Sequence, residues 1–83
     1  MKVTVKYFAS IREAIGIGSE SLDTAATTLG ALRDELIARG GAHATSLARG
    51  KAVRVALNQV MSDEAASLVE GAEVAFFPPV TGG

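Results

Sequence analysis

Apolar and polar side chains alternate along residues 2–8. Val3, Val5 and Tyr7 share one parity, and lysine and threonine fill the positions between them. This period-two pattern is typical of a half-buried β-strand. Neighbouring side chains of a strand point to opposite faces, so Phe8 falls on the outer, polar face. The pattern predicts an amino-terminal strand with one aromatic ring on its outer side.

The segment after this strand carries the signals of a short helix. Ser10 and Glu13 have the spacing of a capping box, in which each side chain accepts a hydrogen bond from the backbone N–H of the other residue. Gly16 suits the left-handed conformation that ends many helices. These residues predict a short helix that ends at Gly16. Residues 16–19 then indicate a turn, and residues 20–23 indicate a short strand.

Apolar residues next recur at spacings of three and four, which is the period of an amphipathic helix. They are Leu29, Leu32, Leu36 and Ile37. Thr27 or Thr28 is expected to cap the start of this main helix, and Gly40–Gly41 to end it. The charged side chains of the segment are expected to face outward. They are Arg33, Asp34 and Arg39.

The rest of the chain predicts one helical turn and two further strands. They are residues 43–49 for the helical turn and residues 53–57 and 73–77 for the strands. Both strands follow from their alternation. Val74 and Phe76 are expected to point inward from the last strand, which directs Phe77 outward.

Several strands and one main helix in so short a chain indicate an α+β fold, with a mixed sheet covered by the helix on one face. The order suits a ubiquitin-like β-grasp, in which the first and last strands are parallel neighbours at the centre. Phe8 and Phe77 then meet on the open face. A contiguous aromatic patch often marks an interface, so we expect a partner to dock there. We assign residues 1–77 to this domain and residues 78–83 to an extended tail.

Composition narrows the function. The 83 residues carry eight Lys and Arg against nine Asp and Glu, without a basic run, which argues against nucleic acid as a partner. Cysteine is absent, so disulfides, thiolate metal sites and a cysteine nucleophile are excluded. We interpret His43, the single histidine, as an ordinary loop residue without metal partners. The chain has neither a long apolar run nor a signal-peptide pattern, so we expect a cytoplasmic protein without membrane contact.

The candidate chemistry lies in the tail. Pro78 and Pro79 end the last strand because proline has no N–H for a sheet ladder. A polyproline-like path would then carry Gly83 roughly 15 to 20 Å from the domain. The residues expected to thread a partner's channel are Val80, Thr81 and Gly82, of which the glycine is the thinnest. The main-chain carboxylate of Gly83 is the candidate reactive group.

Three segments carry a specific resemblance. They are Tyr-Phe-Ala-Ser-Ile-Arg-Glu at 7–13, Ala-Leu-Asn-Gln at 56–59, and the unbroken run from Glu70 to Gly83. Together they resemble the family of small, sulfur-carrying subunits of molybdopterin synthase. The last segment is the most specific, because it joins a turn, the final strand, the double proline and the glycine tip.

The resemblance implies a non-catalytic carrier of activated sulfur. An adenylating enzyme of the ubiquitin-activating type would consume ATP to convert the Gly83 carboxylate to an acyl-adenylate, and a sulfur donor would replace AMP to give a thiocarboxylate. The large synthase subunit, in a heterotetramer, would pass this sulfur to cyclic pyranopterin monophosphate. The carrier would hold no tightly bound cofactor. Its partner interface would comprise Phe8, Phe77, Pro78 and Pro79.

Three alternatives stay open on the sequence. The chain could carry sulfur for another pathway, such as thiamine synthesis or tRNA thiolation, although the Phe-Phe-Pro-Pro-Val-Thr segment favours the molybdopterin branch. It could be a ubiquitin-like modifier conjugated to lysines. It could also be a plain interaction domain, which would tolerate the loss of Gly83.

Overall fold

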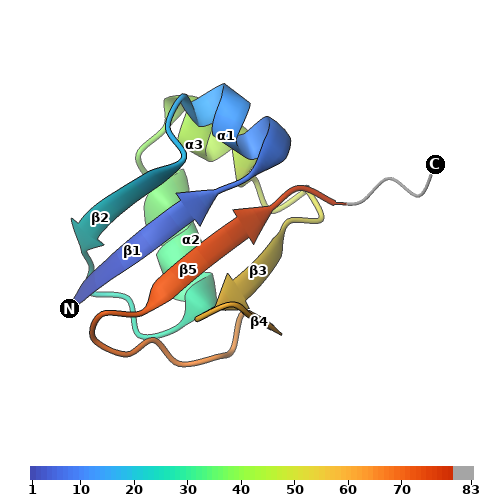
Figure 1. The fold of residues 1–83 in the computed structure, drawn as a ribbon. Coiled ribbons are helices and arrows are strands. Elements are labelled where there is room, and N and C mark those ends of the chain that lie inside the picture. Colours follow the sequence, from blue (N-terminus) through green and yellow to red (C-terminus); the bar gives the residue numbers. More distant parts are fainter. Residues whose placement is uncertain (80–83) are drawn as a thin grey trace.

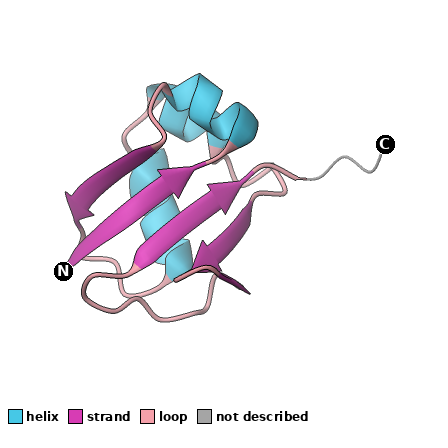
Figure 2. Ribbon diagram, viewed as in Figure 1, coloured by secondary structure: helices cyan, strands magenta, loops and turns pink. Residues whose placement is uncertain are grey.

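The computed structural model describes residues 1–79, which form five strands and three helices. The elements in chain order are β1 (Lys2–Tyr7), α1 (Ala9–Ile15), β2 (Ser19–Asp23), α2 (Leu29–Ile37), α3 (Gly41–Ser46), β3 (Arg54–Leu57), β4 (Val60–Ser62) and β5 (Glu73–Phe77). Figure 2 shows a single sheet with the helices behind it and at one of its ends. The α+β prediction is confirmed, while β4 was not predicted. None of the helices in this part of the chain is long and apolar enough to cross a membrane.

The strands form one mixed sheet in the order β2-β1-β5-β3-β4. β1 and β5 are parallel neighbours, with Val5 beside Val74 and Tyr7 beside Phe76. The other strand pairs are antiparallel. α2 crosses one face of the sheet, and α1 and α3 lie together near the carboxyl end of β1 (Figure 1). The predicted parallel pairing of the first and last strands, with the main helix on one face, is confirmed.

The hydrophobic core lies between this sheet and α2. Its largest members have at most 1% of their surface exposed, and they are Val3, Val5, Tyr7, Leu29, Leu32, Leu36, Leu47, Val74 and Phe76. Fully burying an aliphatic or aromatic side chain stabilises a fold by roughly 1.5–3 kcal/mol, so this set accounts for much of the driving force. The prediction of which side chains of β1 and β5 point into the core is therefore confirmed.

The start of α1 differs from the prediction. Ser10 lies inside the helix, and Phe8 occupies the N-cap position without a side-chain hydrogen bond. The backbone turns at Ala9, which has a φ of 50°. The N–H groups of Ile11 and Arg12 then donate to the carbonyl of Phe8, at 3.2 and 3.3 Å. This turn starts the helix too early for a Ser10 capping box, so that prediction is wrong. The predicted end at Gly16, with a φ of 93°, is confirmed.

Thr28, one of the two predicted caps, is the N-cap of α2. Its Oγ1 accepts a hydrogen bond from the Ala31 N–H at 3.1 Å. The expectation that Arg33 faces outward is wrong, since this residue is only 3% exposed. A buried guanidinium is tolerated when its donors have acceptors. Those acceptors are the carbonyls of Leu47, Ala48 and Lys51 and the carboxylate of Glu64. Arg33 therefore joins α2 to the segment before β3.

Candidate functional site

The two outward phenylalanines meet at the carboxyl ends of β1 and β5. The rings of Phe8 and Phe77 stack with centroids 4.7 Å apart and planes 10° apart. Phe8 remains 39% exposed, and Phe77 is half-buried. The proximity follows from the parallel register, in which the residue after Tyr7 lies beside the residue after Phe76. The predicted aromatic pair on the open face is confirmed.

The aromatic pair continues into an apolar hollow on the same face. Arg54, Met61, Phe77 and Pro78 line this hollow, whose volume is about 250 Å³. Met61 is 52% exposed and lies next to the aromatic pair in this hollow, and a contiguous apolar surface often marks an interface. We call Phe8, Phe77, Met61 and Pro78 the sheet patch. Its geometry suits a protein partner that covers the open face.

Met61 was missed in the sequence because β4 was missed. Asn58 and Gln59 have φ values of 49° and 70°, which is the pattern of a two-residue hairpin loop. Asn58 Oδ1 also accepts the N–H of Glu73 at 2.9 Å, which ties the loop to β5. Asparagine at such a turn is the signal that could have predicted the hairpin. It places Met61 beside Ala56 on the outer face.

The structure describes only the first two residues of the predicted tail, Pro78 and Pro79. Pro78 is half-buried and Pro79 is exposed, and both follow directly on β5. The other predicted tail residues, Val80, Thr81, Gly82 and Gly83, lie outside the described residues. The described chain thus brings the two prolines beside the stacked phenylalanines. The division into a domain over 1–77 and a tail over 78–83 stays a prediction.

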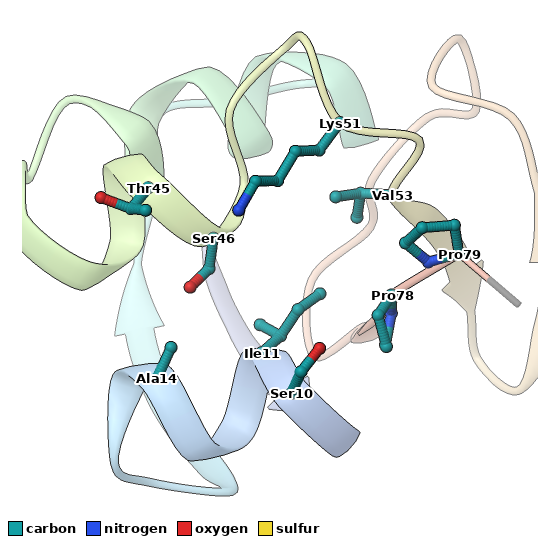
Figure 3. Close-up of a pocket in the computed structure, with 9 residues that line it drawn as sticks. All are labelled: Ser10, Ile11, Ala14, Thr45, Ser46, Lys51, Val53, Pro78 and Pro79. Carbon is teal, nitrogen blue, oxygen red and sulfur yellow. The ribbon is translucent and has the colours of Figure 1, made fainter. Parts of the chain in front are cut away.

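A second hollow lies on the other side of the prolines, between α1, α3 and the segment before β3. Its volume is about 380 Å³, and Pro78 and Pro79 form one of its sides (Figure 3). Its polar groups are the hydroxyls of Ser10 and Ser46 and the ammonium of Lys51, since the Thr45 hydroxyl donates to the Gly41 carbonyl at 3.1 Å. The lining residues that the structure describes include no carboxylate or histidine, and they offer binding contacts.

The titratable side chains form a polar network away from the tail. Glu20 accepts hydrogen bonds from Tyr7 Oη at 2.7 Å and Arg39 Nη1 at 2.8 Å, and His43 Nε2 lies 3.3 Å from its carboxylate. Burial alone would raise the pKa of Glu20, but the hydrogen bonds from these three side chains together hold it below its usual range. Burial, reinforced by Glu20, raises the pKa of Tyr7.

This network is a structural brace between β1, β2, α3 and the segment that joins α2 to α3. His43, interpreted from the sequence as a loop residue, instead lies on α3 with its ring edge-on to Tyr7 at 5.7 Å. Within residues 1–79, no three His, Asp or Glu side chains gather as a metal site would require. These side chains thus serve the fold, and they lie on the helix-covered face of the sheet, opposite the sheet patch.

Comparison with known proteins places the chain in a family. A model described as the ThiS family matches residues 5–83. The chain belongs to the ThiS family. Among relatives of this ThiS-family protein, the molybdopterin synthase sulfur carrier subunit of Haemophilus influenzae is 40% identical over 81 residues, which cover 98% of this chain and 99% of the relative. The resemblance to small subunits of molybdopterin synthase is therefore confirmed.

Solved structures confirm the ubiquitin-like β-grasp fold. SAMP1 from Haloferax volcanii is 26% identical, covers the whole of both chains and superimposes with a TM-score of 0.79. A chain from the complex of subunits 1 and 2 of the molybdopterin-converting factor of Helicobacter pylori is 27% identical, again over the whole of both chains, with a TM-score of 0.69. This ThiS-family protein is thus similar both to a sulfur-carrier subunit and to an archaeal protein of the same fold.

Proposed function

We propose that this ThiS-family protein is the sulfur carrier of molybdopterin synthase. The observation that carries the proposal is the 40% identity, over nearly the full length of both chains, with a molybdopterin synthase sulfur carrier subunit. The match with the family model extends to Gly83, so the glycine tip is part of the shared pattern. The sheet patch beside Pro78 and Pro79 supports the proposal, because it offers an apolar surface next to the start of the tail.

The chemistry proposed for Gly83 needs no side chain of the carrier. A carboxylate is a poor electrophile until one of its oxygens becomes part of a good leaving group. In the proposed reaction, a carboxylate oxygen attacks the α-phosphorus of ATP, and pyrophosphate leaves. A donor that releases sulfur at the sulfide level then supplies hydrosulfide, which attacks the carbonyl carbon of the acyl-adenylate; the bond to AMP breaks, AMP leaves, and loss of the proton gives a thiocarboxylate. The activating enzyme consumes the ATP, and the carrier itself holds no cofactor.

The proposed partners follow from this sequence of steps. An adenylating enzyme of the ubiquitin-activating type would take the tail first. The large synthase subunit would take it next and transfer the sulfur to cyclic pyranopterin monophosphate, within a heterotetramer. The H. pylori complex of subunits 1 and 2 supports a large-subunit partner for this chain. We place these steps in the cytoplasm, where ATP is available to the activating enzyme.

A second function is favoured by one observation. SAMP1 superimposes over the whole chain, and a second structure of the H. volcanii protein bears the name small archaeal modifier protein 1. A modifier would use the same activated Gly83 carboxylate, with a lysine amine as the acceptor in place of sulfur. The two functions therefore differ in the nucleophile and share the tail.

Mass spectrometry of the carboxyl-terminal peptide tests the proposal. The full chain is incubated with ATP, the adenylating enzyme and a sulfur donor, and we expect the peptide to gain the mass of one sulfur in place of one oxygen. A chain lacking Gly83 serves as the control and should stay unmodified, with an unchanged melting temperature, because terminal residues generally add little to the stability of a domain. Adducts on lysines of other proteins, without thiocarboxylate, would favour the modifier. Unimpaired cofactor synthesis by the truncated chain would refute the carrier.

A further inference from the structure

The hollow between α1 and α3 has the shape of a short groove beside the end of the described chain. Its apolar part comes from two segments, with Ile11 and Ala14 on α1 and Val53 just before β3. Pro78 and Pro79 close one side (Figure 3). A volume of about 380 Å³ is at the lower end of the range for ligand pockets and suits a few side chains.

The described lining of this groove carries a positive charge. Lys51 is the one charged residue among the lining residues that the structure describes, and Figure 3 shows its ammonium reaching over the groove toward Ser46. Among residues 1–79, none of the ion pairs found involves Lys51. The hydroxyls of Ser10 and Ser46 add donors around the same space, whereas the Thr45 hydroxyl donates to the Gly41 carbonyl at 3.1 Å. This combination complements a carboxylate attached to an apolar stem.

The wall that carries Lys51 is held in place from behind. Buried Arg33 donates to the carbonyls of Ala48 at 2.7 Å and Lys51 at 3.1 Å. Within the loop, the Lys51 N–H donates to the Ala48 carbonyl at 2.9 Å, and the Val53 N–H to the Lys51 carbonyl at 2.9 Å. The backbone of the wall is therefore positioned before any partner arrives, which lowers the entropic cost of binding.

The groove is continuous with the sheet patch. Pro78 lines both the hollow that contains Met61 and Phe77 and the groove that contains Lys51. A partner that covers Phe77 and takes up the tail must pass Pro78. The same partner is then within reach of the groove.

We propose that this groove binds a segment of the large synthase subunit in which an Asp or Glu side chain lies next to an aliphatic side chain. The carboxylate pairs with Lys51, and the aliphatic group packs on Ile11 and Val53. This inference rests on the proposed function and adds a second anchor to it, distinct from the aromatic pair. The groove thereby fixes the direction in which the tail enters the partner.

Titration calorimetry with the large subunit of the same organism tests the anchor. We expect Lys51→Glu to raise the Kd at least about tenfold, because it replaces an attraction by a like-charge repulsion. Lys51→Met should lose less, and its difference from the unmodified protein should shrink at high salt. Lys2→Glu, an equal change of charge at the start of β1, is the matched control and should change the Kd less than twofold.

A steric variant makes the test independent of charge. Ala14 is exposed on α1, so Ala14→Phe should fill the groove, keep the fold and weaken binding as well. Ala31→Phe, at an exposed position on α2, is its matched control and should bind normally. Melting curves confirm that each variant is folded.

The outcomes separate this inference from the proposed function. The groove proposal is refuted if Lys51→Glu and Ala14→Phe weaken binding to the large subunit no more than their controls do. This holds even if Phe77→Ala weakens binding and so supports the sheet patch as an interface. Losses seen only with the adenylating enzyme would overturn the choice of partner. If the unmodified chain failed to bind the large subunit at all, both the groove proposal and the proposed function would be refuted.

Discussion

Replacing Phe77 with alanine separates the two roles that an aromatic ring on the open face can have. In the first role the ring is an anchor for a partner, and in the second it is part of the core. Phe77 is half-buried and stacked on Phe8 at 4.7 Å, whereas its neighbour Phe76 is fully buried at 0% exposure. The adjacent phenylalanines therefore form a matched pair for the comparison.

The expected losses follow from these exposures. Full burial of a phenylalanine is worth about 1.5–3 kcal/mol, and at least roughly two-thirds of that is already realised for Phe77 in the isolated domain. Completing the burial in a complex leaves at most about 1 kcal/mol, to which emptying the partner's pocket adds about as much again. Phe77→Ala should therefore raise the Kd for the large subunit by about 10- to 30-fold.

The stability of the isolated domain should change less for Phe77 than for Phe76. Phe77→Ala loses about two-thirds of a ring's burial plus a stacking interaction of about 0.5–1.5 kcal/mol, which gives roughly 1.5–3.5 kcal/mol. Phe76→Ala should lose about 3–5 kcal/mol, as expected of a large-to-small change in a core. Phe8→Ala should resemble Phe77→Ala, and the double variant should be less than additive because the two rings share one contact.

Calorimetric titration with the large subunit and urea unfolding of each free variant provide both quantities. The reasoning is refuted if Phe77→Ala binds normally while it loses as much stability as Phe76→Ala, because the ring would then belong to the core. It is also refuted if the Phe8 and Phe77 losses are fully additive, because the stacked contact would then contribute nothing.

Three further predictions concern the tail, the buried arginine and the polar network. Gly82→Val should slow activation or sulfur transfer while leaving the melting temperature unchanged, which kinetics with both partner enzymes can check. Arg33→Met should destabilise the domain by roughly 1–3 kcal/mol in urea unfolding, because it takes the side-chain donor from the Leu47 carbonyl and leaves Arg49 as the remaining arginine on the Glu64 carboxylate. The lowered pKa of Glu20 stabilises the fold above the ordinary pKa of about 4.5, and this contribution is lost as the pH falls through the lower folded value. The free energy of unfolding should therefore fall below about pH 5, and this fall should be shallower in Glu20→Gln than in the control Glu13→Gln on exposed α1.

Patterns between near neighbours in the chain carried much of the fold. Alternation in β1 and β5, the spacing of three and four in α2, the Thr28 cap and the Gly16 stop depend on residues within a turn or a strand of one another. The parity of Phe8 and Phe77, combined with a parallel pairing of β1 and β5, was enough to place the two rings together. The family resemblance rested on the same local segments and on the glycine tip.

The remaining features depend on contacts between distant segments. Arg33 is charged and lies on a helix, which favours exposure, yet its acceptors lie 14 to 31 residues away in the chain. Ser10 has the spacing of a cap, but the turn at Ala9 sets the start of α1 at Phe8. Met61 reaches the sheet patch only through the pairing of β4 with β3.

The groove at Lys51 has the same origin, since α1, α3 and the segment before β3 meet only in the folded chain. Periodicity and capping are decided by interactions over a few residues, which the order of the sequence exposes directly. Burial of a charge and the shape of a hollow depend on which distant surfaces meet, and that is decided by the packing of the whole domain.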